Sequence, residues 1–263
     1  MQSLLWTSGG LGFIFLMTTL GAATVFIFRK TEVGKFQNIF LGFAAGVMVA
    51  ASIWSLLIPS IEETTAQGGA GWFPAATGFV LGALFLLGLD KLIPHLHPQS
   101  NTIEGMPSKS KRTTLLIAAV TLHNIPEGMA VGLSFALAAQ RGSDPAAYAS
   151  AIALALGIGI QNFPEGAAIS LPLRQEGNSA GKSFGLGVLS GAVEPVFGLL
   201  TAILAGFFIP VMPWLLAFAA GAMLYVVVEE LIPEAHLGEH GNTGTMGVMV
   251  GFLIMMILDV ALG

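Results

Sequence analysis

Two short polar motifs interrupt long apolar stretches of this 263-residue chain. HNIPEG occupies residues 123–128, and QNFPEG repeats its pattern at residues 161–166. A charged side chain at the centre of a membrane helix costs about 2.5–3.5 kcal/mol on insertion scales, so such residues mark functional sites. The two copies predict a polar site built inside a membrane, most simply a site for a metal cation.

The spacing within each motif puts its polar groups on one side of a helix. His123 and Glu127 are four residues apart, and so are Gln161 and Glu165, so the members of each pair are neighbours on a helix surface. The proline of each motif has no N–H and clashes with the carbonyl one turn earlier. It therefore bends the helix and frees a carbonyl that protein, water or an ion must cover.

The amides of Asn124 and Asn162 complete the donor set. Together the motifs offer one imidazole, two carboxylates and three amides, which suits Zn²⁺ and also Fe²⁺, Mn²⁺ or Cd²⁺. The set contains too much nitrogen for a dedicated Mg²⁺ site, and a chain without cysteine has no thiolate ligand. Glu127 and Glu165 could bridge two ions about 3.5–4 Å apart. The alternative, an intrahelical His–Glu pair that pins spans together, explains one copy better than two.

Glu194 is a third carboxylate in an apolar segment. It stands beside Pro195 with no other charge near it in the sequence, so it should face a polar interior and join the same site. The alternatives are a proton-binding group or a hydrogen bond to a serine or threonine of another span. Met48 is more ambiguous, because a methionine on a membrane helix usually serves packing.

Composition indicates the elements that must hold these residues. The chain is 54% hydrophobic and only 10% charged, against roughly 25% charged residues in soluble domains. A span needs about 20 mainly apolar residues. We therefore predict an all-α polytopic membrane protein with a single transmembrane domain over 1–263 and eight spans: 4–28, 36–61, 71–89, 113–139, 146–173, 183–208, 213–228 and 243–262.

The basic residues predict the orientation. With eight spans, nine Lys and Arg residues fall on one side of the membrane and only Arg141 on the other. Cytoplasmic loops carry the excess of Lys and Arg, so both termini are expected outside. The first span has Arg29 and Lys30 after it and no basic stretch before it, and we expect it to be retained. The interior loop, about 98–112, is expected to be mobile.

Internal similarity predicts inverted repeats. Because spans 4 and 5 are consecutive, they run in opposite directions, and each carries one motif. A weaker similarity joins FAAGVM at 43–48 in span 2 to FAAGAM at 218–223 in span 7, with Leu-Ile-Pro following one residue out of step. This indicates a 3+2+3 arrangement, a recurrent transporter design with its site near the midplane.

Further polar residues lie near the predicted span ends. On the interior side they are candidates for an exit route or are ordinary solvated helix ends: Asp90, His95, His97, Glu229, Glu230, Glu234 and His236. On the outer side Ser55, Glu62 and Glu63 are candidates for a cation entrance, with a polar cap as the alternative. Asp259 has no predicted role.

The paired motifs resemble those of the ZIP (Zrt-, Irt-like protein) divalent-metal transporters, most closely the bacterial GufA-like branch. The resemblance covers nearly the whole chain. It implies a cell-membrane protein that moves Zn²⁺ and related ions into the cytoplasm, with no cofactor beyond the transported ion and no nucleic-acid partner. It also implies a homodimer, and an elevator-like motion of spans 1, 4, 5 and 6 against spans 2, 3, 7 and 8.

The resemblance also implies two metal positions. The ligands of the first would be Met48, His123, Glu127, Gln161 and Glu165. The ligands of the second would be Asn124, Glu127, Asn162, Glu165 and Glu194. Some relatives have an acidic residue in place of Asn162 and a histidine in place of Glu229, so the second position here carries less charge and the exit more.

The sequence alone leaves two other functional classes open. An intramembrane metalloenzyme would use two metals and an activated water, but the chain has no His-Glu-x-x-His pattern. A structural or sensor protein would use the carboxylates only to pack helices.

Overall fold

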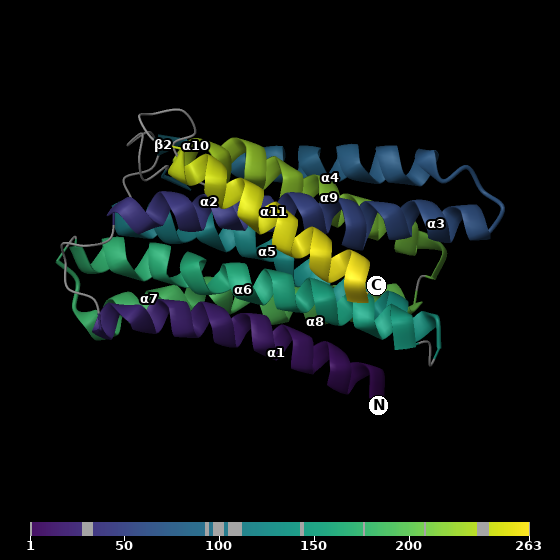
Figure 1. Ribbon diagram of the computed structural model, residues 1–263, viewed down its shortest axis with the longest axis horizontal. Coiled ribbons are helices and arrows are strands. Elements are labelled where there is room, and N and C mark those ends of the chain that lie inside the picture. The colour runs from purple at the N-terminus through teal and green to yellow at the C-terminus, as the bar shows by residue number, and fades with distance from the viewer. Residues whose placement is uncertain are drawn as a thin grey trace.

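The computed structural model describes residues 2–27, 34–92, 95–96, 103–104, 112–142, 145–175, 177–207, 209–235 and 242–262. These residues fold into a bundle of long helices that run along a common direction (Figure 1). The described α-helices are α1 (Gln2–Ala23), α2 (Gly34–Ala51), α3 (Ile58–Ala66), α4 (Trp72–Leu92), α5 (Arg112–Gln140), α6 (Pro145–Gln175), α7 (Ala180–Gly191), α8 (Val193–Phe207), α9 (Met212–Val226), α10 (Ile232–Glu234) and α11 (Thr243–Leu262).

Seven described segments are long and apolar enough to cross a membrane: Leu4–Phe26, Asn38–Ala66, Trp72–Leu92, Ala146–Leu171, Ala180–Ala205, Met212–Leu231 and Thr243–Ala261. α5, the helix at the place of the predicted fourth span, has 29 residues. The predicted helical membrane class is therefore confirmed. The described chain departs from a purely helical one only at β1 (His95–Leu96) and β2 (Ile103–Glu104), which pair antiparallel between α4 and α5.

Prolines shape several of these helices. Two π-helical segments, η2 (Ser52–Leu57) and η4 (Val227–Leu231), each end directly before an Ile-Pro pair. Proline cannot donate to the helical hydrogen-bond ladder, and single π turns inside α-helices are common at functional sites. The predicted sixth span is likewise divided at Ala192, so that Glu194 lies in the first turn of α8. Two short 3₁₀ turns, η1 (Thr24–Phe26) and η3 (Ile209–Val211), complete the described elements.

α5 and α6 form the centre of the bundle. They are antiparallel and contact each other, and between them they contact α1, α2, α7, α8, α9 and α11. Their inner faces bury large side chains such as Phe135 and Leu154. Both described ends of the chain, on α1 and α11, lie at the same end of the molecule (Figure 1).

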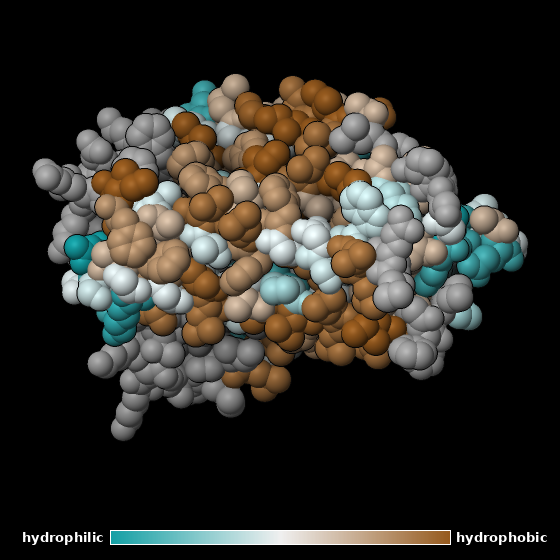
Figure 2. All heavy atoms as spheres, turned by 90° about the horizontal axis from the view of Figure 1, so that it is seen from below, coloured by the Kyte–Doolittle hydropathy of each residue, from teal (hydrophilic) through white to brown (hydrophobic). Residues whose placement is uncertain are grey.

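The outer surface is apolar around its middle. Figure 2 shows hydrophobic residues over most of the central part of one face and hydrophilic ones toward its two ends. Exposed leucines and other large apolar residues occur on α1, α4, α8 and α11. A helix surface that is this apolar suits contact with lipid rather than water.

Candidate metal site

The two motif helices bury their polar residues against each other. Asn124 and Glu127 on α5, and Gln161 on α6, are 0% exposed. Asn162 and Glu165 are also buried. Buried polar groups of this kind are costly unless they find hydrogen bonds or charges of opposite sign. Where their partners lie therefore decides what the site can do.

A chain of hydrogen bonds joins three of these residues to Glu194, across three helices. The Nε2 of Gln161 donates to Oε1 of Glu127 at 2.5 Å and to Oδ1 of Asn162 at 3.2 Å. The Nδ2 of Asn162 in turn donates to Oε2 of Glu194 at 3.0 Å. This bond makes Glu194, the carboxylate of α8, part of one network with both motifs. Its side chain is 0% exposed.

Two further helices supply partners to this network. The Oγ1 of Thr18, on α1, lies 3.0 Å from Oε1 of Glu194. The Nδ2 of Asn124 donates to the carbonyl of Ser190 on α7 at 3.0 Å. The polar network thus draws on α1, α5, α6, α7 and α8. Glu194 thus accepts from a motif amide and also from a threonine of another span, the hydrogen bond that the sequence offered as an alternative for it.

Three oxygens of the network are buried without a hydrogen-bond partner among the described residues: Oδ1 of Asn124, Oε2 of Glu127 and Oε1 of Gln161. Oxygen acceptors left in this state each cost about 1–3 kcal/mol. The carboxyl groups of Glu127, Glu165 and Glu194 also lie close enough to interact electrostatically. Buried, partnerless oxygens beside several carboxyl groups are the chemistry that a cation satisfies.

Glycines let the helices of the site approach closely. A Cβ added at Gly128 would overlap the backbone of Glu194, and one added at Gly166 would overlap the backbone of Thr18. Each motif glycine therefore presses its helix against the helix that carries the next polar partner. Small residues at such contacts are typical of helix packing in lipid. The same close approach joins α2 and α11, where Gly42 and Gly46 lie against the backbone of α11, and Gly247 and Gly251 lie against the backbone of α2.

The described contacts include no side-chain link between this network and two predicted ligands, His123 and Met48. The backbone of His123 belongs to α5, but its side chain lies outside the described residues. Met48 is buried on α2, which packs against α6, and its carbonyl accepts from Ser52 at 2.7 Å. Among the described side chains, no three His, Asp or Glu groups are arranged to hold a metal by themselves. A cation here needs the amides or His123 as well.

The candidate exit residues gather in part around Tyr225. Its hydroxyl lies 3.2 Å from Oδ2 of the buried Asp90, joining α9 to α4. Glu229 is exposed and Glu230 is buried, and both lie close enough to Tyr225 to act on it electrostatically. The remaining candidates, namely the side chains of His95 and Glu234 and all of His97 and His236, lie outside the described residues.

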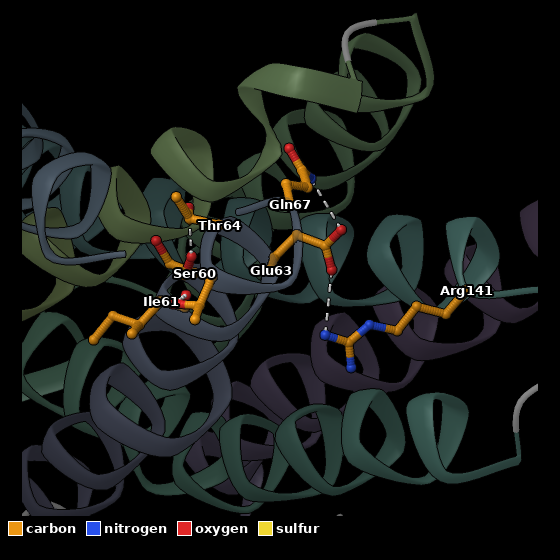
Figure 3. A network of polar contacts seen from close by, with 7 residues as sticks. Ser60, Ile61, Glu63, Thr64, Gln67 and Arg141 are labelled. Atoms are coloured by element: carbon orange, nitrogen blue, oxygen red, sulfur yellow. Dashed lines mark hydrogen bonds and ion pairs between the residues drawn. The ribbon is translucent and has the colours of Figure 1, made fainter. Parts of the chain in front are cut away.

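The three candidate entrance residues do not form one cluster. Ser55 is buried in η2, and its hydroxyl donates to Oδ1 of Asp259 at 2.6 Å. Glu62 is exposed on α3. Glu63 instead accepts from Gln67 and pairs with Arg141 across 3.3 Å, so it links α3 to the end of α5 (Figure 3).

Thr18 and Tyr225 are the polar partners that sequence reasoning missed. A lone threonine or tyrosine in an apolar helix carries little signal, because a threonine often bonds the carbonyl one turn back. For Thr18 the available clue was the alternative that Glu194 forms a hydrogen bond to a serine or threonine of another span. Asp259, which had no predicted role, accepts a hydrogen bond from Ser55 on its Oδ1.

Comparison with known proteins identifies the family of this chain. The profile of the ZIP Zinc transporter family matches residues 104–259. The chain is 38% identical to Zinc transporter ZIP11 of Homo sapiens, over 97% of this chain and 96% of that protein. It is 39% identical to Zinc transporter GufA of Myxococcus xanthus, over 94% of each, and 39% identical to Zinc transporter ZIPB of Bordetella bronchiseptica, over 95% of this chain and 79% of that protein.

These relatives are named as transporters rather than as enzymes, which decides against the metalloenzyme class. Their similarity spans 94–97% of this chain. Several apolar helices and a buried site between antiparallel motif helices agree with it. This chain is a multi-pass membrane protein of the ZIP zinc transporter family.

Proposed function

We propose that this protein carries Zn²⁺ across the membrane through the buried network of α5, α6 and α8. The observation that carries the proposal is the set of partnerless oxygens on Asn124, Glu127 and Gln161, buried beside three carboxylates. The names of the relatives support zinc as the cargo. The donor set is of intermediate hardness, so Cd²⁺, Fe²⁺ and Mn²⁺ are further substrates in this proposal.

Two ion positions fit the ligands available. We assign the first to His123, Glu127, Gln161 and Glu165, with Met48 as a thioether neighbour. We assign the second to Asn124, Glu127, Asn162, Glu165 and Glu194. Glu127 and Glu165 are common to both sets, as bridging carboxylates are in other sites with two metals about 3.5–4 Å apart. The Coulomb interaction of Glu127 with Glu165 and Glu194 supports this grouping.

The amides offer the site both hydrogen-bond donors and acceptor oxygens. Gln161 donates its N–H to Glu127, and Asn162 donates to Glu194. An amide carries both donors and an acceptor oxygen. In this proposal each amide supports the carboxylate when the ion is absent, and its oxygen faces the ion when the ion is present.

The packing pattern supports the 3+2+3 inverted arrangement. α1 makes its most extensive contact with α6, and α5 with α8, while α2 pairs with α11 and α4 with α9. An inversion would exchange span 1 with span 6, span 2 with span 7, span 3 with span 8, and span 4 with span 5. That exchange turns the α1–α6 pair into the α8–α5 pair, and the α2–α11 pair into the α9–α4 pair.

The π segments support the same relation. η2 begins four residues after Met48, and η4 begins four residues after Met223; each ends immediately before an Ile-Pro pair. η2 has six residues and η4 has five. The one-residue slip between the two sequence repeats therefore falls inside these wide turns.

The same pairing supports an elevator-type motion. The two most extensive contacts of the site-bearing spans, α1–α6 and α5–α8, are made within the group 1, 4, 5 and 6. The contacts α2–α11 and α4–α9 are made within the group 2, 3, 7 and 8. A slide of one group along the other would keep intact the close contacts between glycines and neighbouring backbones, such as those of Gly128 with Glu194 and of Gly82 with Phe218. It would carry the ion with the network.

We infer the orientation of the protein from its basic residues and propose uptake into the cytoplasm from the family resemblance. We place the end of the bundle bearing Lys91 and Arg174 in the cytoplasm of a cell membrane, with both termini outside. In this orientation Asp90, Glu229 and Glu230 belong to the inner exit; the other exit candidates, His95, His97, Glu234 and His236, stay predictions because they or their side chains lie outside the described residues. Ser55, Glu62 and Glu63 lie toward the outer entrance. A homodimer is proposed on family resemblance alone.

A flux assay tests the proposal. Purified protein in liposomes with an internal zinc-sensitive dye should admit Zn²⁺ faster than empty liposomes. Glu127→Gln should lower the flux about tenfold or more, since changes even beside metal ligands cost 10–100-fold, while the folded state persists because a buried charge is replaced by a neutral amide.

Lys182→Gln, at an exposed position of α7 outside the proposed site, entrance and exit, is the control and should transport normally. Flux equal to that of empty liposomes, or a Glu127→Gln variant as active as the unmodified protein, would refute the proposal. Release of lipid or peptide fragments without flux would restore the metalloenzyme.

A further inference from the structure

Glu194 is held by donors from two different helices. Its Oε2 accepts from Asn162 on α6, and its Oε1 lies 3.0 Å from the hydroxyl of Thr18 on α1. Both side chains are buried: Thr18 is 1% and Glu194 0% exposed. Hydrogen bonds to a charged group are stronger than neutral ones, so these two donors fix the direction in which the carboxylate points.

The hydroxyl of Thr18 has a second acceptor within reach. Its Oγ1 also lies 3.2 Å from the carbonyl of Ile14, one turn earlier on α1. A hydroxyl carries a single proton, so it can donate to Ile14 or to Glu194 but not fully to both. In a variant that lacks the Glu194 carboxylate the proton still has an acceptor in Ile14, so no buried donor is left without a partner.

Close backbone packing keeps Thr18 in this place. Gly166 of the second motif presses on the backbone of Thr18, and Gly191 lies against the Thr18 methyl group and close to Oε1 of Glu194. The neighbouring Thr19 differs, because its hydroxyl is buried without a hydrogen-bond partner among the described residues. Bonding to the carbonyl one turn back is common for threonine; the bond to a carboxylate on another helix is the feature that needs a reason.

We propose that Thr18 is a positioning residue for Glu194: its hydroxyl holds that carboxylate in the direction of the second ion position. This inference rests on the proposed function and adds α1 to the helices that determine ion affinity. Thr18 itself contacts no ion in this mechanism. It acts only through Glu194.

Calorimetric titration of the purified protein with Zn²⁺ tests this role. The unmodified protein should bind two ions, and Glu194→Gln should identify the weaker or lost one as the second position. Thr18→Val keeps the shape and removes the donor, so it should weaken that position about tenfold, the scale of one hydrogen bond to a charged group. The first position should change less than about twofold on the same scale.

Thr18→Ser restores the hydroxyl and should recover most of the affinity, whereas Thr19→Val should bind like the unmodified protein. Should Thr18→Val fail to fold, Thr18→Ala makes the same comparison. Two unchanged affinities in the valine variant, or equal losses at both positions that serine does not rescue, would overturn the positioning role. An unmodified protein that binds no Zn²⁺ would overturn the proposed function itself, and this role with it.

Discussion

At the scale of single residues, the site is a set of carboxylates whose hydrogen bonds come mainly from amides. Gln161 and Asn162 each donate to a glutamate of another helix. Neutral donors stabilise buried charge without adding a positive group that would repel a cation. Replacing an amide by a carboxylate should therefore separate the stability of the ion-free protein from its affinity for the ion.

Asn162→Asp makes this separation measurable. The substitution removes the donor to Glu194 and puts a second carboxylate beside it, so the ion-free protein should lose about 1–3 kcal/mol of stability. Zn²⁺ should raise the melting temperature of the variant more than that of the unmodified protein, because a ligand of the folded state stabilises it in proportion to its affinity. Thermal unfolding with and without Zn²⁺ gives both quantities.

Asn242→Asp is the control, because Asn242 is exposed before α11. It should respond to Zn²⁺ as the unmodified protein does. A zinc-dependent shift no larger in Asn162→Asp than in this control would contradict the assignment of Asn162 to the second position.

The residues of the network were predictable to different degrees. Glu127, Gln161 and Glu165 were predicted from a duplicated motif, and Glu194 from the cost of a lone charge among apolar residues. Thr18 was not, because its own helix offers it an adequate acceptor in Ile14. Long-range partners such as Tyr225 for Asp90 depend on which helices meet, and spacing along one helix does not contain that information.

At the scale of elements, backbone contact determines how near the polar groups lie. α5 approaches α8 at Gly128 and Gly132, and α6 approaches α1 at Gly166. An added methyl group at such a contact forces the helices apart, and overpacking typically costs about 1–3 kcal/mol. The distance between Glu194 and the motif residues should grow with it.

Gly128→Ala is thus expected to lower both zinc flux and the free energy of unfolding. Gly185→Ala, on α7 of the same span as Glu194, is the control: an added Cβ meets nothing within 4 Å there. It should keep normal flux and gain slight stability from the better helix propensity of alanine. Zinc flux in liposomes and chemical denaturation of the same samples measure both effects. A Gly128→Ala protein with normal flux and stability would show that the close α5–α8 contact is not required.

The helices themselves were largely predictable, and their irregularities were not. Apolar length identified α1, α4 and α11 directly. Pro195 raised the expectation of a special position for Glu194 but not the division of the span at Ala192. The only trace of the π segments in the sequence was a one-residue mismatch between the two repeats, and such a mismatch does not by itself predict a π-helix. The β1–β2 pair has two residues in each strand, too few for a periodic signal.

At the scale of the whole molecule, the proposed motion must break the contacts that join the two groups of spans. One of them is the ion pair of Glu63 with Arg141, between α3 and the end of α5 (Figure 3). An exposed ion pair contributes only about 0–1 kcal/mol, so it cannot by itself hold the molecule in one state. A covalent link at the same place can.

Because the chain has no cysteine, Glu63→Cys combined with Arg141→Cys gives a single reactive pair. A short bifunctional thiol reagent with a cleavable centre should stop zinc flux when it bridges the pair and release it on cleavage. Thr64→Cys with Gln67→Cys lies within and at the end of α3 and should tolerate the same reagent. Full flux through completely cross-linked Glu63/Arg141 protein would exclude relative movement of these two spans.

The wide turn of η2 also sets the rotational phase of everything beyond it. Each residue of an α-helix advances the side chains by about 100°, so removal of the additional residue would swing α3 by roughly that angle. The Ser60 hydroxyl would then leave the carbonyl of Pro213, which it now meets at 2.7 Å, and Glu63 would point away from Arg141. One surplus residue in the middle of the span thus decides which neighbours the outer end faces.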